Sequence, residues 1–301
     1  MRIASNQYAA TMNTALQTAN AGLARVTSQM ASGSRILKPS DDTIATVRLA
    51  RLTREQSALN QYRDNIGALG TRLDTNEVTL GSMKDDLMMV RDQMVWAADG
   101  SNTPDDLKAM ASSLESLRDS LLYSSNARNA EGKYLFSGTA TDIPTVAYDG
   151  TQPPGARYSQ GVGVNSATQD VAVADGVTVA ANIPMAAYNV PAFLNSLDQA
   201  IDAFKNGTYT NTTAANQITS VDTLLNSVAG QISVLGGRQN VLQTLDGNHA
   251  SVGLSNEQSE RELGQLDYAE ASVRLNSYTL AVQATQKAYA KVSNLSLFDV
   301  I

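Results

Sequence analysis

Apolar residues recur every seven positions through a long stretch of the chain, and this pattern predicts a long helix. The recurring positions are Leu52, Leu59, Ile66, Leu73, Leu80, Leu87 and Met94. A companion position three residues later holds Tyr62, Leu69, Met83, Val90 and Ala97, with Asn76 as its one polar member. Spacings that alternate between three and four residues are typical of helices that pack along a seam. We therefore expect one helix over about residues 41–98, packed against other helices because isolated helices are marginal in water.

The two ends of the chain carry helical stripes of their own and little charge. The N-terminal stripe comprises Leu16, Leu23, Val26 and Met30, and the C-terminal stripe comprises Leu280, Ala284, Ala288, Val292 and Leu295. The ends, residues 1–40 and 271–301, together carry a formal charge of +6 against −7 for the whole chain, which leaves −13 for the middle. A membrane-surface helix normally carries many basic residues, so we favour packing of the ends against each other and against further copies.

Helix starts and stops can be read from single residues. Gly33 is a plausible stop for the first helix, and Ser40, Asp41 and Asp42 are expected to form the cap and first turn of the long one, because short acceptors and negative charge suit a helix N-terminus. Thr103 is expected to cap a third helix, with Asp106 completing a capping-box-like pair.

The helical pattern of the sequence ends at Gly132, and the pattern that follows predicts a β-rich insertion over residues 134–190. Lys133 to Gly138 is expected to form a strand, and two valine-rich arms around Asp175-Gly176 predict a hairpin. Helical patterning then returns over about residues 193–204, over 218–242 and from about residue 257 onward. Within the second of these stretches, Gly236-Gly237 is expected to mark a kink or a close helix contact.

These elements predict a mainly α fold: a long coiled-coil-like helical bundle formed by the N- and C-terminal parts, with a small β-rich domain inserted in the middle. The expected division has three parts. Residues 1–40 and 271–301 pair as an inner coiled-coil domain, residues 41–133 and 191–270 form a helical bundle domain, and residues 134–190 form the β-rich outer insertion.

Composition gives little support to catalysis. The chain has no cysteine, and its single histidine, His249, is expected at an ordinary exposed or loop position. The acidic pairs are expected to cap helices or to lie on a solvated face, and the acidic balance argues against nucleic acid as a partner. We therefore expect no enzymatic activity, no cofactor and no metal. The N-terminus also lacks the apolar core of a cleaved secretory signal, and no apolar run is long enough to cross a membrane.

Four motifs resemble the flagellin superfamily. They are residues 32–42 (SGSRILKPSDD), residues 132–138 (GKYLFSG), residues 235–240 (LGGRQN) and residues 295–298 (LSLF). The form with Pro39-Ser40 and the Leu297-Phe298 ending resemble the hook–filament junction family, hook-associated protein 3, more than flagellin itself. Residues 139–190 match no pattern of the superfamily.

The resemblance implies a non-enzymatic structural adaptor of the bacterial flagellum. Such proteins form a ring of copies between hook-associated protein 1 and flagellin, after export through the flagellar type III apparatus with the help of an export chaperone. It implies an extracellular location, inner packing by the terminal stripes, and a corner between inner and outer helices. The expected corner residues are Gly33, Arg35, Pro39, Ser40, Asp41 and Asp42. A flagellin filament subunit is the alternative within the superfamily. A coiled-coil signalling module is the alternative outside it, but it would need a membrane or ligand-binding segment.

Overall fold

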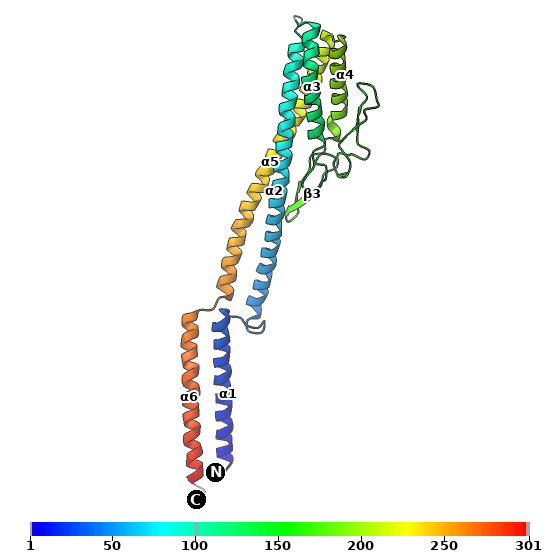
Figure 1. Ribbon diagram of the computed structural model, residues 1–301. Coiled ribbons are helices and arrows are strands. Elements are labelled where there is room, and N and C mark those ends of the chain that lie inside the picture. Colours follow the sequence, from blue (N-terminus) through cyan, green and yellow to red (C-terminus); the bar gives the residue numbers. More distant parts are fainter. Residues whose placement is uncertain (1, 100–101, 299–301) are drawn as a thin grey trace. The chain divides into compact units, whose positions relative to one another are not determined.

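The computed structural model describes residues 2–99 and 102–298, and it describes the side chains of residues 7–99, 102–210 and 212–291. Within this part the chain forms α-helices and a few short strands (Figure 1). The helices are α1 (Arg2–Ser32), α2 (Thr43–Ala97), α3 (Pro104–Ser125), α4 (Val190–Asn206), α5 (Asn211–Gly264) and α6 (Tyr268–Phe298). A short 3-10 helix, η1 (Ala186–Tyr188), precedes α4. The predicted mainly α fold with a small β-rich insertion is confirmed.

The chain divides into two compact units. The terminal unit comprises Met1–Ala58 and Ala250–Ile301, and the central unit comprises Leu59–His249. The long helices α2 and α5 contribute residues to both units. The three-part division expected from the sequence stays a prediction.

The core of the central unit follows the heptad stripe of α2. Leu73, Leu80 and Leu87 on that stripe are fully buried, and they belong to a cluster that includes side chains of α3, α4 and α5. Polar contacts along the edges of the seam hold α2 and α5 antiparallel, from Arg63–Asp246 (2.8 Å) to Arg91–Asp222 (2.6 Å).

Asn76 interrupts this seam, and we expect its replacement by leucine to stabilise the protein. The side chain is completely buried, and neither amide atom has a hydrogen-bond partner among the described residues. An unsatisfied buried polar group costs about 1–3 kcal/mol, so Asn76→Leu should raise the free energy of unfolding by about that amount. Urea denaturation of the two proteins measures the difference.

The neighbouring exposed residue supplies the control for this experiment. Thr75→Leu adds an apolar side chain one position away on the solvated face and should leave the stability within about 0.5 kcal/mol of the original. A destabilised Asn76→Leu protein would contradict the prediction, because it would show that the amide makes favourable interactions in the core.

The β-rich insertion contains two small antiparallel pairs. Strand β1 (Val146–Tyr148) pairs with β2 (Tyr158–Gln160), and β3 (Asp170–Ala174) pairs with β4 (Val177–Ala180). The second pair is the predicted hairpin around Asp175-Gly176, and Gly176 adopts the positive φ of 68° that its turn requires.

The strand expected over Lys133–Gly138 is not formed. Instead this segment makes turns and one isolated bridge, between Arg128 and Tyr134. Gly132 and Gly138, one before and one at the end of the segment, have φ of 78° and 72°, so the chain turns there instead of continuing as a strand. The apolar pair that suggested a strand, Leu135 and Phe136, is buried in the central core in this irregular backbone.

Asparagine side chains attach the insertion to the helices by imitating strand pairing. Asn195 of α4 accepts a hydrogen bond from the backbone N–H of Tyr158 (2.9 Å) and donates to the carbonyl oxygen of the same residue (2.7 Å). Asn126, at the end of α3, makes the equivalent two bonds with Val146 (3.0 and 2.8 Å). Backbone groups on one edge of each strand of the first pair are therefore satisfied without a further strand.

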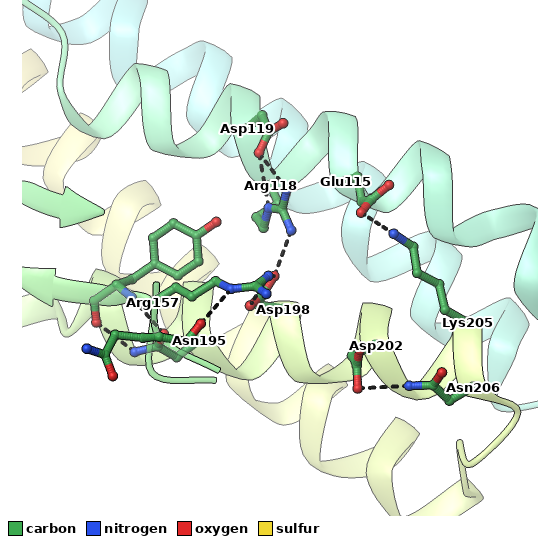
Figure 2. Close-up of polar contacts among 11 residues, drawn as sticks. Glu115, Arg118, Asp119, Arg157, Asn195, Asp198, Asp202, Lys205 and Asn206 are labelled. Atoms are coloured by element: carbon green, nitrogen blue, oxygen red, sulfur yellow. Dashed lines mark hydrogen bonds and ion pairs between the residues drawn. The ribbon is translucent and has the colours of Figure 1, made fainter. Parts of the chain in front are cut away.

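A buried ion-pair cluster lies beside Asn195 (Figure 2). Asp198 of α4 is 2% exposed and pairs with Arg118 of α3 (2.7 Å) and Arg157 of the insertion (3.3 Å). Burial raises the pKa of the adjacent Tyr158 to about 12. Three separate segments therefore converge on one carboxylate.

Three local expectations need correction. His249 is neither exposed nor in a loop: it lies within α5, is 9% exposed, contacts the Val173 carbonyl oxygen (2.8 Å) through Nε2, and stacks on Tyr62. A Cβ on Gly236 or Gly237 would meet open space, so the expected close helix contact is wrong, while the alternative of a kink stays a prediction. The last helix begins at Tyr268 instead of about residue 257, because α5 continues to Gly264. The expected capping box of Thr103 with Asp106 is present.

Candidate assembly interface

Helices α1 and α6 lie side by side in the terminal unit (Figure 1). Their shared core is small, consisting of Val26, Leu266 and Ala271, with Met30, Leu275 and Tyr278 packed against it at partial exposure. Because a few contacts of this kind bury little apolar surface, the pairing of the two ends depends strongly on each of them.

A glycine allows the two helices to approach closely. A Cβ on Gly22 would come within 2.5 Å of the ring of Tyr278, so any larger residue there would displace the ring. A second tyrosine of α6, Tyr268, donates a hydrogen bond from its hydroxyl to the carbonyl oxygen of Met30 (3.2 Å). Two aromatic side chains of α6 thus contact α1 within this seam.

The residues expected to carry the inner packing fall into three groups. Val26 is buried, and the side chains at half-buried positions are Leu16, Leu23, Met30 and Ala288. Leu280 is 65% exposed and Ala284 is exposed, so neither packs against α1 within the chain. Val292 and Leu295 lie outside the residues whose side chains are described. An assembly role for this set stays a prediction.

The stripe of α6 that the chain itself covers differs from the one expected from the sequence. Its members, at alternating steps of four and three residues, are Ala271, Leu275, Tyr278, Val282 and Thr285. All five are buried or half-buried, whereas the expected stripe begins at the exposed Leu280, two positions away from Val282. Both stripes are apolar over most of their length, so periodicity alone does not distinguish them.

The corner between α1 and α2 is tied to the turn between α5 and α6. The Arg35 backbone N–H donates to the Gly264 carbonyl oxygen (2.8 Å), and the Leu266 N–H donates to the Gly33 carbonyl oxygen (3.0 Å). The Arg35 guanidinium adds a bond to the Leu263 carbonyl oxygen (2.9 Å) and pairs with Asp42 (3.1 Å). The expected corner residues Gly33, Arg35 and Asp42 are therefore brought together, along with partners more than two hundred residues away.

A tight turn explains the Pro-Ser pair. The Asp41 N–H donates to the Lys38 carbonyl oxygen (2.9 Å), which places Pro39 and Ser40 at the two central positions of a turn. Proline favours the first central position because its ring fixes φ near the required value. The turn also shows that Ser40 is not the cap of α2, which begins at Thr43.

The two aspartates have different tasks. Asp42 accepts a hydrogen bond from the Ala45 N–H (2.9 Å) and so caps α2. Asp41 instead accepts from the N–H groups of Leu37 (3.1 Å) and Lys38 (3.0 Å) and pairs with Arg25 of α1 (2.8 Å). The expectation that both belong to the first turn of α2 is therefore corrected for Asp41, which holds the loop.

These contacts predict that acid weakens the corner. The Lys38 N–H lowers the pKa of Asp41, and the Ala45 N–H lowers that of Asp42, with Arg25 and Arg35 acting in the same direction. Stability from a carboxylate with a lowered pKa is present above its ordinary value of 3.8 and is lost as the pH falls through the lower pKa of the folded state. The protein should therefore lose stability between about pH 4 and about pH 2.

Urea unfolding at about pH 6 and about pH 3 measures this loss. The double variant Asp41→Asn/Asp42→Asn keeps side-chain acceptors but cannot titrate, so it should be less stable than the original at the higher pH and lose less on acidification. An equal loss in both proteins would assign the acid sensitivity to other carboxylates.

The described residues include neither a candidate metal-binding group nor a candidate membrane span. Among them, no group of three or more histidine, aspartate or glutamate side chains is placed to hold a metal ion. None of the described helices combines the length and apolar character needed to cross a membrane. What the site presents is a set of helix faces and a hydrogen-bonded corner.

Comparisons with known proteins show which proteins this chain resembles. The model of the bacterial flagellin N-terminal helical region matches residues 3–141. Flagellar hook-associated protein 3 of Escherichia coli (strain K12) is 26% identical over 292 residues, covering 90% of each chain. A solved structure from Vibrio parahaemolyticus, described as a flagellar hook-associated protein, is 32% identical with a TM-score of 0.67, covering 75% of this chain and 100% of its own. A hook-associated protein 3 structure from Legionella pneumophila, 14% identical with a TM-score of 0.60, covers 71% of this chain and 99% of its own and shares the fold.

Proposed function

Because this chain belongs to the flagellar hook-associated protein family, with hook-associated protein 3 among its relatives, we propose that it is the structural adaptor that joins the flagellar hook to the flagellin filament. Copies form a ring, with hook-associated protein 1 on one side and flagellin on the other. The protein is extracellular, has no catalytic activity, and reaches its place through the flagellar type III apparatus with an export chaperone.

The observation that carries this proposal is the incomplete burial of the terminal helix pair. Val273 and Leu280 of α6 are each 65% exposed in a single chain, and Leu16 and Leu23 of α1 are only half-buried. Apolar side chains at helical spacing that the chain itself does not cover are suited to packing against further copies. The corner between α1 and α2 is hydrogen-bonded to the turn between α5 and α6, and so it supports the α1–α6 pair.

Deletion of the gene tests the proposal. Cells should carry hooks without filaments and release flagellin into the medium, and the intact gene should restore attachment. Antibody labelling of restored cells should mark the junction and not the length of the filament, which separates an adaptor from a filament subunit. Normal filaments on the deletion strain would overturn the proposal.

A further inference from the structure

The first turns of α2 present a basic and apolar stripe to solvent. Ile44 and Val47 are each 68% exposed, and Arg48, Arg51 and Arg54 are exposed beside them. Steps of three, four and seven residues place all five on one side of the helix. Ala45 and Leu52, which are buried in the terminal unit, border this side of the helix, because Arg48 lies three residues after the first and four before the second. The five residues are here called the basic stripe.

The arginines of this stripe have no carboxylate partner among the described residues. Among the described residues, Arg48 and Arg51 have no hydrogen-bond or ion-pair partner, whereas every other arginine whose side chain the structure describes has at least one. Arg54 donates only to the Ala50 carbonyl oxygen of its own helix. Glu55, the one acid on this side of the helix, is not within ion-pair distance of them. Guanidinium groups pair strongly with carboxylates, so a stripe of free ones is prepared for an acidic partner.

Further along α2, in the central unit, a second exposed stripe has the opposite charge. Val78, Met89 and Trp96 are 70%, 52% and 46% exposed, and Asp85 and Asp92 lie exposed between them. Steps of seven, four, three and four residues again define one side of the helix. Neither aspartate has a hydrogen bond or ion pair among the described residues. These five residues are here called the acidic stripe.

We propose that the basic stripe of one copy docks on the acidic stripe of the next copy, as the lateral contact of the ring. Both stripes combine large apolar side chains with unpaired charges, and the charges are opposite. Their spacings also correspond, because six residues from Arg48 to Arg54 rise about 9 Å and seven from Asp85 to Asp92 rise about 10 Å.

The occupant is a second copy because the chain itself supplies the complement. A contact between two unlike surfaces is heterologous, and repetition of such a contact produces a closed ring or a filament instead of an isolated pair. A single helix pair of this size forms a small interface, so the contact gains its strength from repetition around the assembly. This inference rests on the proposed ring.

Cross-linking in assembled flagella tests the contact, since a chain without cysteine accepts designed ones without interference. Val47→Cys combined with Met89→Cys should give a ladder of multimers with a short bismaleimide linker, and either change alone should give none. Val47→Cys combined with Tyr123→Cys, which uses an exposed position outside both stripes, is the matched control and should give no ladder. Flagella that contain the double variant but yield no ladder would overturn the contact.

Charge reversal gives an independent test. Arg48→Glu/Arg51→Glu makes both stripes acidic, and Asp85→Arg/Asp92→Arg makes both basic, so each variant alone should retain filaments about tenfold less often than the original. Co-expression of the two variants allows an alternating arrangement in which every contact joins opposite charges, so it should restore attachment. Normal attachment with either variant alone, or no restoration by both, would contradict the stripes while leaving the adaptor role standing. The adaptor role itself fails only if the gene deletion leaves filaments attached.

Discussion

Replacing Val26 with aspartate should abolish filament attachment without preventing export. Val26 is 3% exposed and forms the centre of the small core that joins α1 to α6. An aspartate there would lose the apolar contact and bury a carboxylate, and Arg25 is already engaged with Asp41. The expected cost is about 2–5 kcal/mol, which a core of this size cannot offset.

Two measurements on the Val26→Asp protein separate assembly from secretion. The variant should appear in the medium at normal amounts, while the cells carry few or no filaments and swim poorly. Circular dichroism of the purified protein should show less helix than the original, because unpaired terminal helices are marginal in water. Asn20→Asp adds the same charge at an exposed position of α1 and should behave like the original protein. Normal motility of the Val26→Asp strain would show that the α1–α6 core is not needed for assembly.

Sequence reasoning succeeded where structure depends on neighbours in the chain. The α2 stripe through Leu73 and Leu80, the capping box of Thr103 and the hairpin at Asp175-Gly176 are all formed. Each is specified within a few residues by helical periodicity, a cap or a turn residue. These signals remain visible in a single sequence because no distant partner is needed to interpret them.

Features that depend on distant partners were missed or only partly predicted. The corner motif was identified, but its bonds from Arg35 to Leu263 and Gly264 join residues whose proximity no local pattern reveals. A lone histidine carries no local signal, and His249 is buried because strand β3 supplies the Val173 carbonyl oxygen and α2 supplies an aromatic ring. The covered stripe of α6 was predicted at the wrong positions, because that helix carries two overlapping apolar stripes. Only contact with α1 decides which of the two is covered.

Replacing Asp198 with alanine should strongly destabilise the central unit. The carboxylate is 2% exposed and neutralises Arg118 and Arg157 from two other segments (Figure 2). Removing one member of a buried ion pair leaves the other charge without compensation and typically costs about 3–5 kcal/mol. Arg118 bears most of this cost, because its side chain is only 13% exposed and its remaining partner, Asp119, lies at the surface.

The effect should be concentrated where the insertion meets α3 and α4. Without Asp198, Arg157 loses its hold on α4, and the Asn195–Tyr158 bonds are left to fix strand β2. Limited proteolysis should therefore cut the insertion of the Asp198→Ala protein faster than that of the original, and urea unfolding should give the loss of stability. The α1–α6 pair belongs to the other unit and should keep its protection.

Two further variants identify the charge as the cause. Asp119→Ala removes a carboxylate that contacts the same Arg118 but is 63% exposed, so it should cost less than about 1 kcal/mol. Asp198→Asn keeps the size and one acceptor oxygen but not the charge, and its stability should fall between those of the original and Asp198→Ala. If Asp198→Ala and Asp119→Ala were equally mild, Arg118 and Arg157 would have to be adequately solvated without the carboxylate. The attachment of the insertion would then rest on the asparagine bonds alone, and Asn195→Ala would become the variant with the larger effect.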